Sequence, residues 1–158
     1  MTDIISSRDI RAASAYELAL SAQWGGDYHG ITYVLPTSGT IADITFQFDE
    51  AVLPADAQAA VDAMGALSAS GAASILPSTD TPITCDDTAI AGDAALDIFV
   101  YWLETKPTFE PDVIDIATVN LGVADYVFNS PLLGWHLVEF RRQGNPESAY
   151  HFIEVTNA

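Results

Sequence analysis

Apolar residues recur at helical spacing in two segments of the chain. Over residues 8–23 they fall every three or four positions, and the Gly25-Gly26 pair that follows is a typical helix end. Over residues 54–69 a second stripe begins behind Pro54, whose missing N–H costs nothing in a first helical turn. The spacing therefore predicts two helices. Their apolar stripes are Ile10, Ala13, Tyr16, Leu20 and Trp24 in the first, and Ala57, Ala60, Val61, Met64 and Leu67 in the second.

Runs of β-branched and aromatic residues predict strands over most of the remaining chain. In residues 41–48, Ile44, Phe46 and Phe48 share one face while polar residues share the other, which is typical of a half-buried strand. Residues 96–104 are apolar on both faces, which indicates a central strand covered on each side. The other predicted strands are residues 30–35, 74–76, 113–120, 125–128, 135–142 and 149–156.

These elements predict a single α+β domain over residues 1–158, built mostly of antiparallel strands and arranged as a sandwich or as a sheet with two helices. Residues 1–7 are polar and are predicted to form an arm. Residues 70–92 are rich in Ser, Thr, Pro, Gly and Asp and are predicted to form a long loop around the short strand at 74–76. Loops of that length usually carry function, move or are held by a partner.

The last two predicted strands are joined by QGNPES, residues 143–148, as a hairpin with Pro146 at the second position of its turn. Pairing Arg142 with Ala149 assigns the side chains to two faces, one of which, with Phe140, Val138, Ile153 and Val155, is the core face. The other face mixes aromatic with charged residues, so we expect either the first helix to cover it, through Tyr16 and Leu20, or another chain. The candidate interaction residues on this face are Trp135, Leu137, Tyr150 and Phe152, which lie among Glu139, Arg141 and Glu154.

The charge balance excludes several classes of partner. The chain of 158 residues holds 22 acids and 5 bases, for a formal net charge of -17. Only 17% of its residues are charged, below the roughly 25% of an ordinary domain, so the imbalance comes from missing bases. So few bases cannot neutralise a run of phosphates or dock on an anionic membrane, which excludes nucleic-acid and membrane partners. The scarcity of lysine and the excess of Asp over Glu resemble proteins adapted to high salt.

The chain shows no sign of export or membrane insertion. No apolar run is long enough for a spanning helix, and MTDIISSRDI lacks the basic and apolar regions of a secretion signal. A cytoplasmic or virion location is expected.

No catalytic or metal-binding motif stands out. Cys85 is the sole cysteine, so it forms no internal disulfide, and the two acids that follow it raise a thiol pKa, which favours a structural role. The hairpin register separates His136 from the position of His151 by four residues, about 13 Å of strand, too far to share an ion. We expect both histidines to be satisfied locally, and His29 to be an ordinary loop residue.

The acidic residues of the predicted loop, Asp80, Asp86, Asp87 and Asp93, supply the oxygen ligands that calcium prefers, but their spacing matches no known cation loop. The sequence therefore predicts no cofactor, no metal and no enzymatic activity. Three function classes remain: a structural subunit of an assembly, an acidic mimic that occupies a basic partner, and a small enzyme whose site forms only in the fold.

The layout of the chain resembles that of small structural proteins of tailed-virus particles, such as head-decoration, head-completion and tail subunits. The resemblance rests on MTDIISSRDI as an arm, the small-residue-rich segment from Ala51 to Gly92, and strands that run almost to Ala158. It implies an oligomeric role in a virion without catalysis. Like or unlike protein subunits would be the partners, contacted through the arm and the 70–92 loop.

Overall fold

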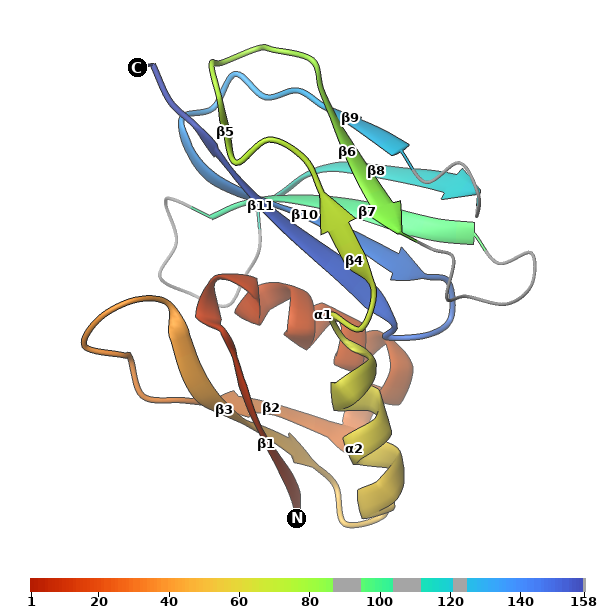
Figure 1. Ribbon diagram of the computed structural model, residues 1–158. Helices are drawn as coiled ribbons and strands as arrows, with labels where there is room; N and C mark the ends of the chain where they lie inside the picture. The colour runs from red at the N-terminus through yellow and green to blue at the C-terminus, as the bar shows by residue number, and fades with distance from the viewer. Residues whose placement is uncertain (87–94, 104–111, 121–124, 158) are drawn as a thin grey trace.

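The computed structural model describes residues 1–86, 95–103, 112–120 and 125–157, and its strands and two α-helices confirm an α+β fold rich in antiparallel strands (Figure 1). The short pair β5–β11 is parallel, and the other described strand pairs are antiparallel. The elements are β1 (Thr2–Asp9), η1 (Ile10–Ala12), α1 (Ala13–Trp24), η2 (Gly25–Asp27), β2 (Tyr28–Thr32), β3 (Ile41–Phe48), α2 (Pro54–Ala63), β4 (Ser68–Ser70), β5 (Ser74–Ile75), β6 (Thr81–Asp86), β7 (Ala95–Trp102), β8 (Asp112–Asn120), β9 (Asp125–Phe128), β10 (Gly134–Arg142) and β11 (Ser148–Val155).

The strands form three sheets, which we name the N-terminal sheet (β1-β3-β2), the central sheet (β5-β11-β10-β7-β8) and the outer sheet (β4-β6-β9). In Figure 1 the N-terminal sheet lies at the bottom, α1 lies between it and the central sheet, and the outer sheet covers the far face of the central sheet. The buried side chains accordingly form two clusters, one around α1 and one between the central and outer sheets. Neither helix in the described ranges is long and apolar enough to cross a membrane.

The prediction that residues 1–7 form an arm is wrong, because they belong to β1. This strand pairs with β3 from Thr2 opposite Phe48 to Asp9 opposite Ile41. Its single inward apolar residue, Ile4, is buried, so the segment has the polar composition of an arm although it is an edge strand. The first helix therefore starts later than predicted, at Ala13.

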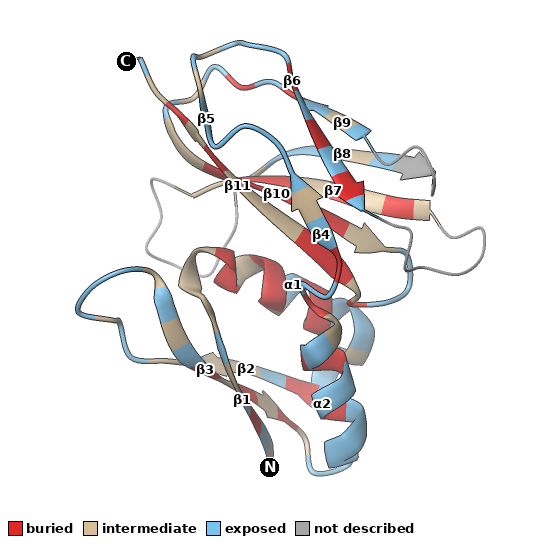
Figure 2. Cartoon of the chain, viewed as in Figure 1, coloured by how far each residue is buried: buried red, intermediate tan, exposed pale blue. Residues whose placement is uncertain are grey.

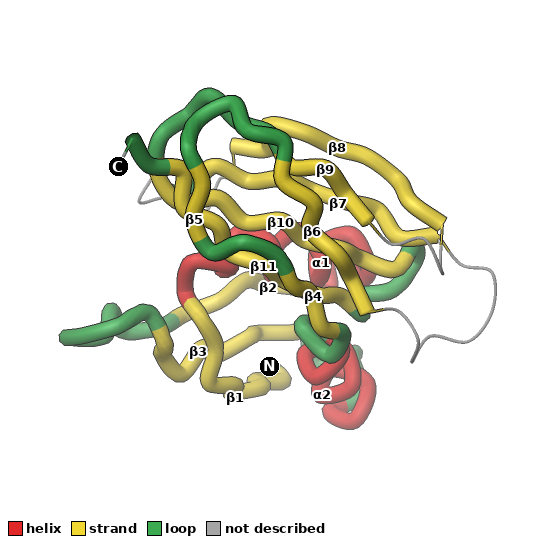
Figure 3. Tube along the Cα trace, turned by 45° about the horizontal axis from the view of Figure 1, so that its top comes forward, coloured by secondary structure: helices red, strands yellow, loops and turns green. Residues whose placement is uncertain are grey.

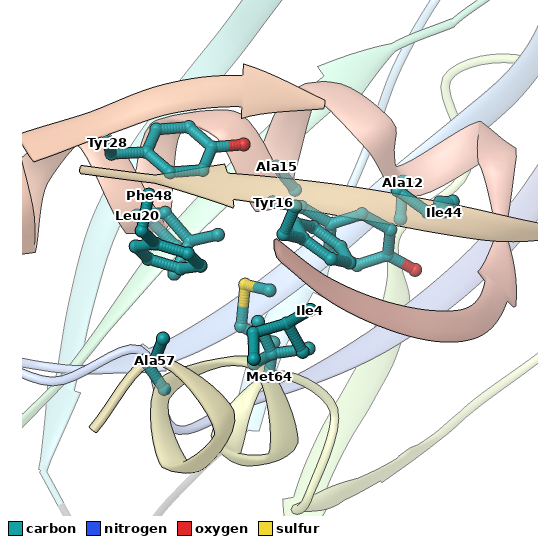
Figure 4. Close-up of a cluster of buried hydrophobic side chains, with 14 of the residues drawn as sticks. Ile4, Ala12, Ala15, Tyr16, Leu20, Tyr28, Ile44, Phe48, Ala57 and Met64 are labelled. Carbon is teal, nitrogen blue, oxygen red and sulfur yellow. The ribbon is translucent and has the colours of Figure 1, made fainter. Parts of the chain in front are cut away.

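Helix α1 packs against both the N-terminal and the central sheet, and its buried residues include several alanines that allow close approach (Figure 2). The ring of Tyr16 meets Phe46 of the N-terminal sheet edge-on at 5.9 Å and Tyr150 of the central sheet at 5.5 Å. Figure 4 shows Tyr16 and Leu20 of α1 facing Met64, just beyond α2, in the shared cluster. The helix ends at Trp24, one residue beyond the predicted 8–23 segment, and the predicted stop signal follows it, with Gly25 at φ 56°.

The second helix is shorter than predicted, and the predicted loop contains a strand. Helix α2 ends at Ala63, and residues 68–70 form β4. The short strand at 74–76 is confirmed as β5, but residues 81–86 form β6, where buried Thr81, Ile83 and Cys85 alternate with exposed residues. Thr and Cys at two of the three inward positions give β6 the composition of a loop. Residues 87–92 of the predicted loop lie outside the described residues.

The central sheet follows the predicted strands closely. The hairpin β10–β11 keeps the predicted faces but is shifted by two residues, with Phe140 opposite Ala149 and Leu137 opposite Phe152. The turn is centred on Gln143 and Gly144 rather than on Pro146, because Gly144 adopts φ 73° and the Asn145 N–H donates to the Arg142 carbonyl at 3.1 Å. Because Gly144 adopts the positive φ, the turn lies at Gln143 and Gly144 and sets the hairpin register, and Pro146 lies after the turn.

The chain passes between β4 and β5 at a tightly packed glycine, which yields a stability prediction. A Cβ on Gly71 would lie 2.5 Å from Ile83 Cδ1, 3.2 Å from the Pro82 carbonyl oxygen and 3.5 Å from His151 Nε2. We expect Gly71→Ala to lower the free energy of unfolding by about 1–3 kcal/mol through overpacking. Gly26→Ala is the matched control, since its Cβ meets nothing within 4 Å. Urea unfolding monitored by circular dichroism measures both, and equal stabilities for the two variants would contradict the packing at Gly71.

Candidate functional site

The predicted interaction residues lie on the face of the central sheet that packs against α1. Leu137 is 1% exposed, and Tyr150 and Phe152 pack against the same cluster as Tyr16 and Leu20. Of the two covers considered for this face, the structure shows the intramolecular one, the N-terminal helix. The open apolar face on which the interface prediction depended is therefore already occupied within the chain.

Arg11 covers the part of this face that α1 does not reach. Its guanidinium lies 4.8 Å from the ring centre of Trp135 and 4.0 Å from that of Phe152, and it pairs with Asp9 at 2.7 Å. Such cation–π contacts contribute about 0.5–2 kcal/mol each, depending on desolvation. The candidate residues thus fix the end of β1 and the start of α1 against the central sheet.

The most unusual chemistry on this face is a buried carboxylate, Glu139, which the sequence pattern places only as one charge among aromatics. It is fully buried and accepts hydrogen bonds from the Tyr101 hydroxyl at 2.6 Å and from Arg141 Nε and Nη2 at 3.0 and 2.9 Å. The Arg141 guanidinium also stacks on Phe99 at 4.5 Å. Burial raises the pKa of Glu139, and Arg141 and Tyr101 partly oppose that rise.

Two hollows lie beside α1. One, of about 430 Å³, is lined by Ala19, Ala22, Gln23, Asp97, Phe99, Arg141, Arg142, Gly144 and Asn145. The other, of about 340 Å³, lies between the end of α1, α2 and the β10–β11 turn. Both contain charged residues that already have partners: Arg141 pairs with Glu139, and Arg142 with Glu147 at 3.4 Å. The charges of these two ion pairs are therefore balanced within the chain.

Ser130 and His136 have the separation of a nucleophile and its base. Ser130 Oγ lies 2.9 Å from His136 Nε2, and His136 Nδ1 lies 3.0 Å from the Gly134 carbonyl oxygen, an arrangement that orients the imidazole. Both residues are 0% exposed, so a substrate has no access to the hydroxyl. The pair instead ties the segment after β9 to β10, which confirms that His136 is satisfied locally.

The other candidate ligands are also engaged in local contacts. His151 lies opposite Val138, two positions from His136 rather than the predicted four, and its Nε2 lies 2.8 Å from the Ala72 carbonyl oxygen. His29 lies in β2 rather than in the predicted loop, and its Nε2 lies 3.3 Å from Asp49 Oδ1. Asp80 accepts a hydrogen bond from Asn129 at 2.6 Å. Cys85 is buried in the cluster between the central and outer sheets.

No group of three or more metal-binding side chains comes together in the described ranges. Asp87 and Asp93 of the predicted acidic cluster lie outside those ranges.

All four arginines are used inside the fold. Arg8 donates to the carbonyls of Val61 and Met64 at the end of α2, where a cation also complements the helix dipole. Arg11, Arg141 and Arg142 are paired as described above, and Lys106 lies outside the described residues. The described surface therefore carries acids with few cationic neighbours.

No protein-family model, curated protein or solved structure matches this chain.

A leucine pair tests the intramolecular cover. We expect Leu137→Ala to lower the free energy of unfolding of the isolated chain by about 2–5 kcal/mol, because it opens a cavity in the cluster around α1. Leu133→Ala, at a residue that is 47% exposed, is the control and should change stability little. Chemical denaturation at a concentration where the chain is monomeric makes the comparison. A Leu137→Ala monomer as stable as the parent would show that the face is not an internal core.

The charge distribution generates a salt prediction. Because 22 acids face 5 bases and the four arginines are already held by contacts within the chain, raising ionic strength from low to molar sodium chloride should relieve repulsion and raise the melting temperature. Differential scanning calorimetry measures the change. A melting temperature that stays flat or falls over this range would contradict the prediction.

Proposed function

We propose that the protein is a non-enzymatic structural subunit of a larger assembly, bound to like or unlike protein subunits, and that this assembly is a virion. The observation that carries the proposal is a set of exposed apolar side chains on the N-terminal sheet and the loop between β2 and β3, which we name the outer patch. Its members are Ile5 (66% exposed), Val34 (85%), Leu35 (72%) and Ile41 (57%).

The two isoleucines of the outer patch lie on the face of the N-terminal sheet that points away from α1. Ile5 pairs opposite Thr45 and Ile41 opposite Asp9, so both isoleucines occupy the face opposite to the buried Ile4 and Ile44. Figure 3 shows the β2–β3 loop, which carries Val34 and Leu35, projecting beyond the N-terminal sheet. Exposed apolar groups gathered on a projection are typical of surfaces that a neighbouring chain covers.

Three of the four residues of the outer patch, Val34, Leu35 and Ile41, lie in a long uncharged stretch of the described chain. Residues 28–42 contain no Asp, Glu, Lys or Arg, although the whole chain has a net charge of -17. Two acidic surfaces repel one another, so a neighbouring subunit approaches at the lowest electrostatic cost where charge is missing. Asp3 and Asp43 border the patch and favour a partner with basic residues at its rim.

The virion is the assembly that the chain layout favours. The resemblance to small tailed-virus proteins keeps two of its three supports, the small-residue-rich composition from Ala51 to Gly92 and the strands that continue to Val155. Its third support, the polar arm, is replaced by β1, and the outer patch takes over the contact role that the arm was expected to have.

Size fractionation tests the proposal. A tagged copy of the full chain, produced in the native source, should co-sediment with a particle much larger than the 16.9 kDa chain, because neighbouring subunits cover the outer patch. The double variant Val34→Asp with Leu35→Asp should stay in the free-protein fraction, since two carboxylates would be buried at the contact.

Leu76→Asp is the matched control, because Leu76 is also exposed, at 54%, but lies outside the outer patch. It should co-sediment like the parent chain. Recovery of the parent only as free protein, at both low and molar salt, would overturn the proposal. Unchanged co-sedimentation of the double variant would remove the outer patch as the contact surface.

A further inference from the structure

Glu139 is the one acid among the described residues that is fully buried. Its carboxylate has three hydrogen-bond donors, two from Arg141 and one from Tyr101. Arg141 is only 12% exposed at its side chain, so this ion pair is largely desolvated. A desolvated ion pair depends on close contact and well-aligned hydrogen bonds between its two charges. Neutralising one partner leaves the other as a buried charge without its counter-ion.

The groups that face Glu139 come from every element packed around it. Tyr101 belongs to β7, Tyr150 to β11 and Tyr16 to α1, and burial raises the pKa of all three, that of Tyr16 to about 12. These phenols therefore stay neutral, and the negative charge of Glu139 contributes to the rise in their pKa values. The one cation in direct contact is Arg141, on the same strand as Glu139, and Arg8 lies beyond the Tyr16 ring.

A hollow next to Arg141 offers its side chain a second position when Glu139 is protonated. Arg141 lines the 430 Å³ hollow beside α1, together with Ala19 and Ala22 of the helix. We propose that Glu139 and Arg141 form a proton-operated latch between β10 and β7 of the central sheet, beside α1. With Glu139 ionised, Arg141 is held against Phe99 and across the sheet; with Glu139 protonated, Arg141 turns into the hollow while Tyr101 keeps its contact with the carboxyl group.

The direction of the pH effect follows from linkage. Burial raises the pKa of Glu139 above its ordinary value of 4.5, so the folded chain binds a proton over a pH range where the unfolded chain has lost it. The contribution of Glu139 to the free energy of unfolding is therefore largest below the ordinary value. It decreases as pH rises through the raised pKa and is level above it. Acid thus releases the latch while the contribution of Glu139 itself favours the folded state, and this conclusion is independent of the proposed assembly role.

Nuclear magnetic resonance on the full chain tests the latch. The side-chain carboxyl ¹³C signal of Glu139 should titrate with a midpoint above 4.5, and the Nε signal of Arg141 should move with the same midpoint. Glu139→Gln should abolish the Arg141 transition, because no proton is taken up beside the guanidinium. Glu147→Gln is the matched control, since it removes the partner of Arg142 on the same hairpin and should leave the Arg141 transition intact.

Tyr101→Phe gives a second readout that does not require Glu139→Gln to fold. Its loss of a hydrogen bond to the ionised carboxylate should shift the Glu139 and Arg141 midpoints upward together. The latch is wrong if Arg141 does not follow Glu139 in the parent chain, or if the Arg141 transition persists in Glu139→Gln. A Glu139 midpoint at or below its ordinary value would equally overturn it.

Discussion

The burial of α1 between two sheets is the contact on which the rest of the structure depends. The N-terminal and central sheets share no strand pairing, and their common core is the cluster around the helix. Tyr16 packs on Phe46 on one side and on Tyr150 on the other. Arg11 fastens the start of the helix to the central sheet, and Arg8 fastens β1 to the end of α2. Two of the four arginines thus join the layers, Arg141 and Arg142 pair within the central sheet and its hairpin turn, and the described surface is left acidic.

Local patterns predicted the elements whose inward positions are apolar. Residues 41–48 and 125–128 form strands with the predicted bounds, and the two faces of β10–β11 are assigned correctly because strand parity survives a shift of two residues. Patterns failed where burial comes from tertiary pairing. β1 needs only Ile4 inside, and β6 buries Thr81 and Cys85 as well as Ile83, so both have the composition of irregular chain.

The candidate site illustrates the same limit. Sequence pattern alone identified Trp135, Leu137, Tyr150 and Phe152 as a face that needs a cover, but it could not choose between α1 and another chain, because the choice depends on how distant segments pack. It also placed Glu139 and Arg141 on that face without revealing that the carboxylate is sealed from water. The sequence pattern did not predict the outer patch, because its apolar residues resemble ordinary inward-facing strand residues. Only the packing of the sheet shows which of its faces is exposed.

Amide hydrogen exchange on the isolated, monomeric chain tests most directly whether α1 is the internal cover of the central sheet. The account predicts that the amides of α1 after its first turn exchange as slowly as those of β10, because both lie in the same buried layer. The amides of the β2–β3 loop should exchange much faster. Exchange of the α1 amides at the rate of that loop would contradict the account, because the hairpin face would then be open in the single chain.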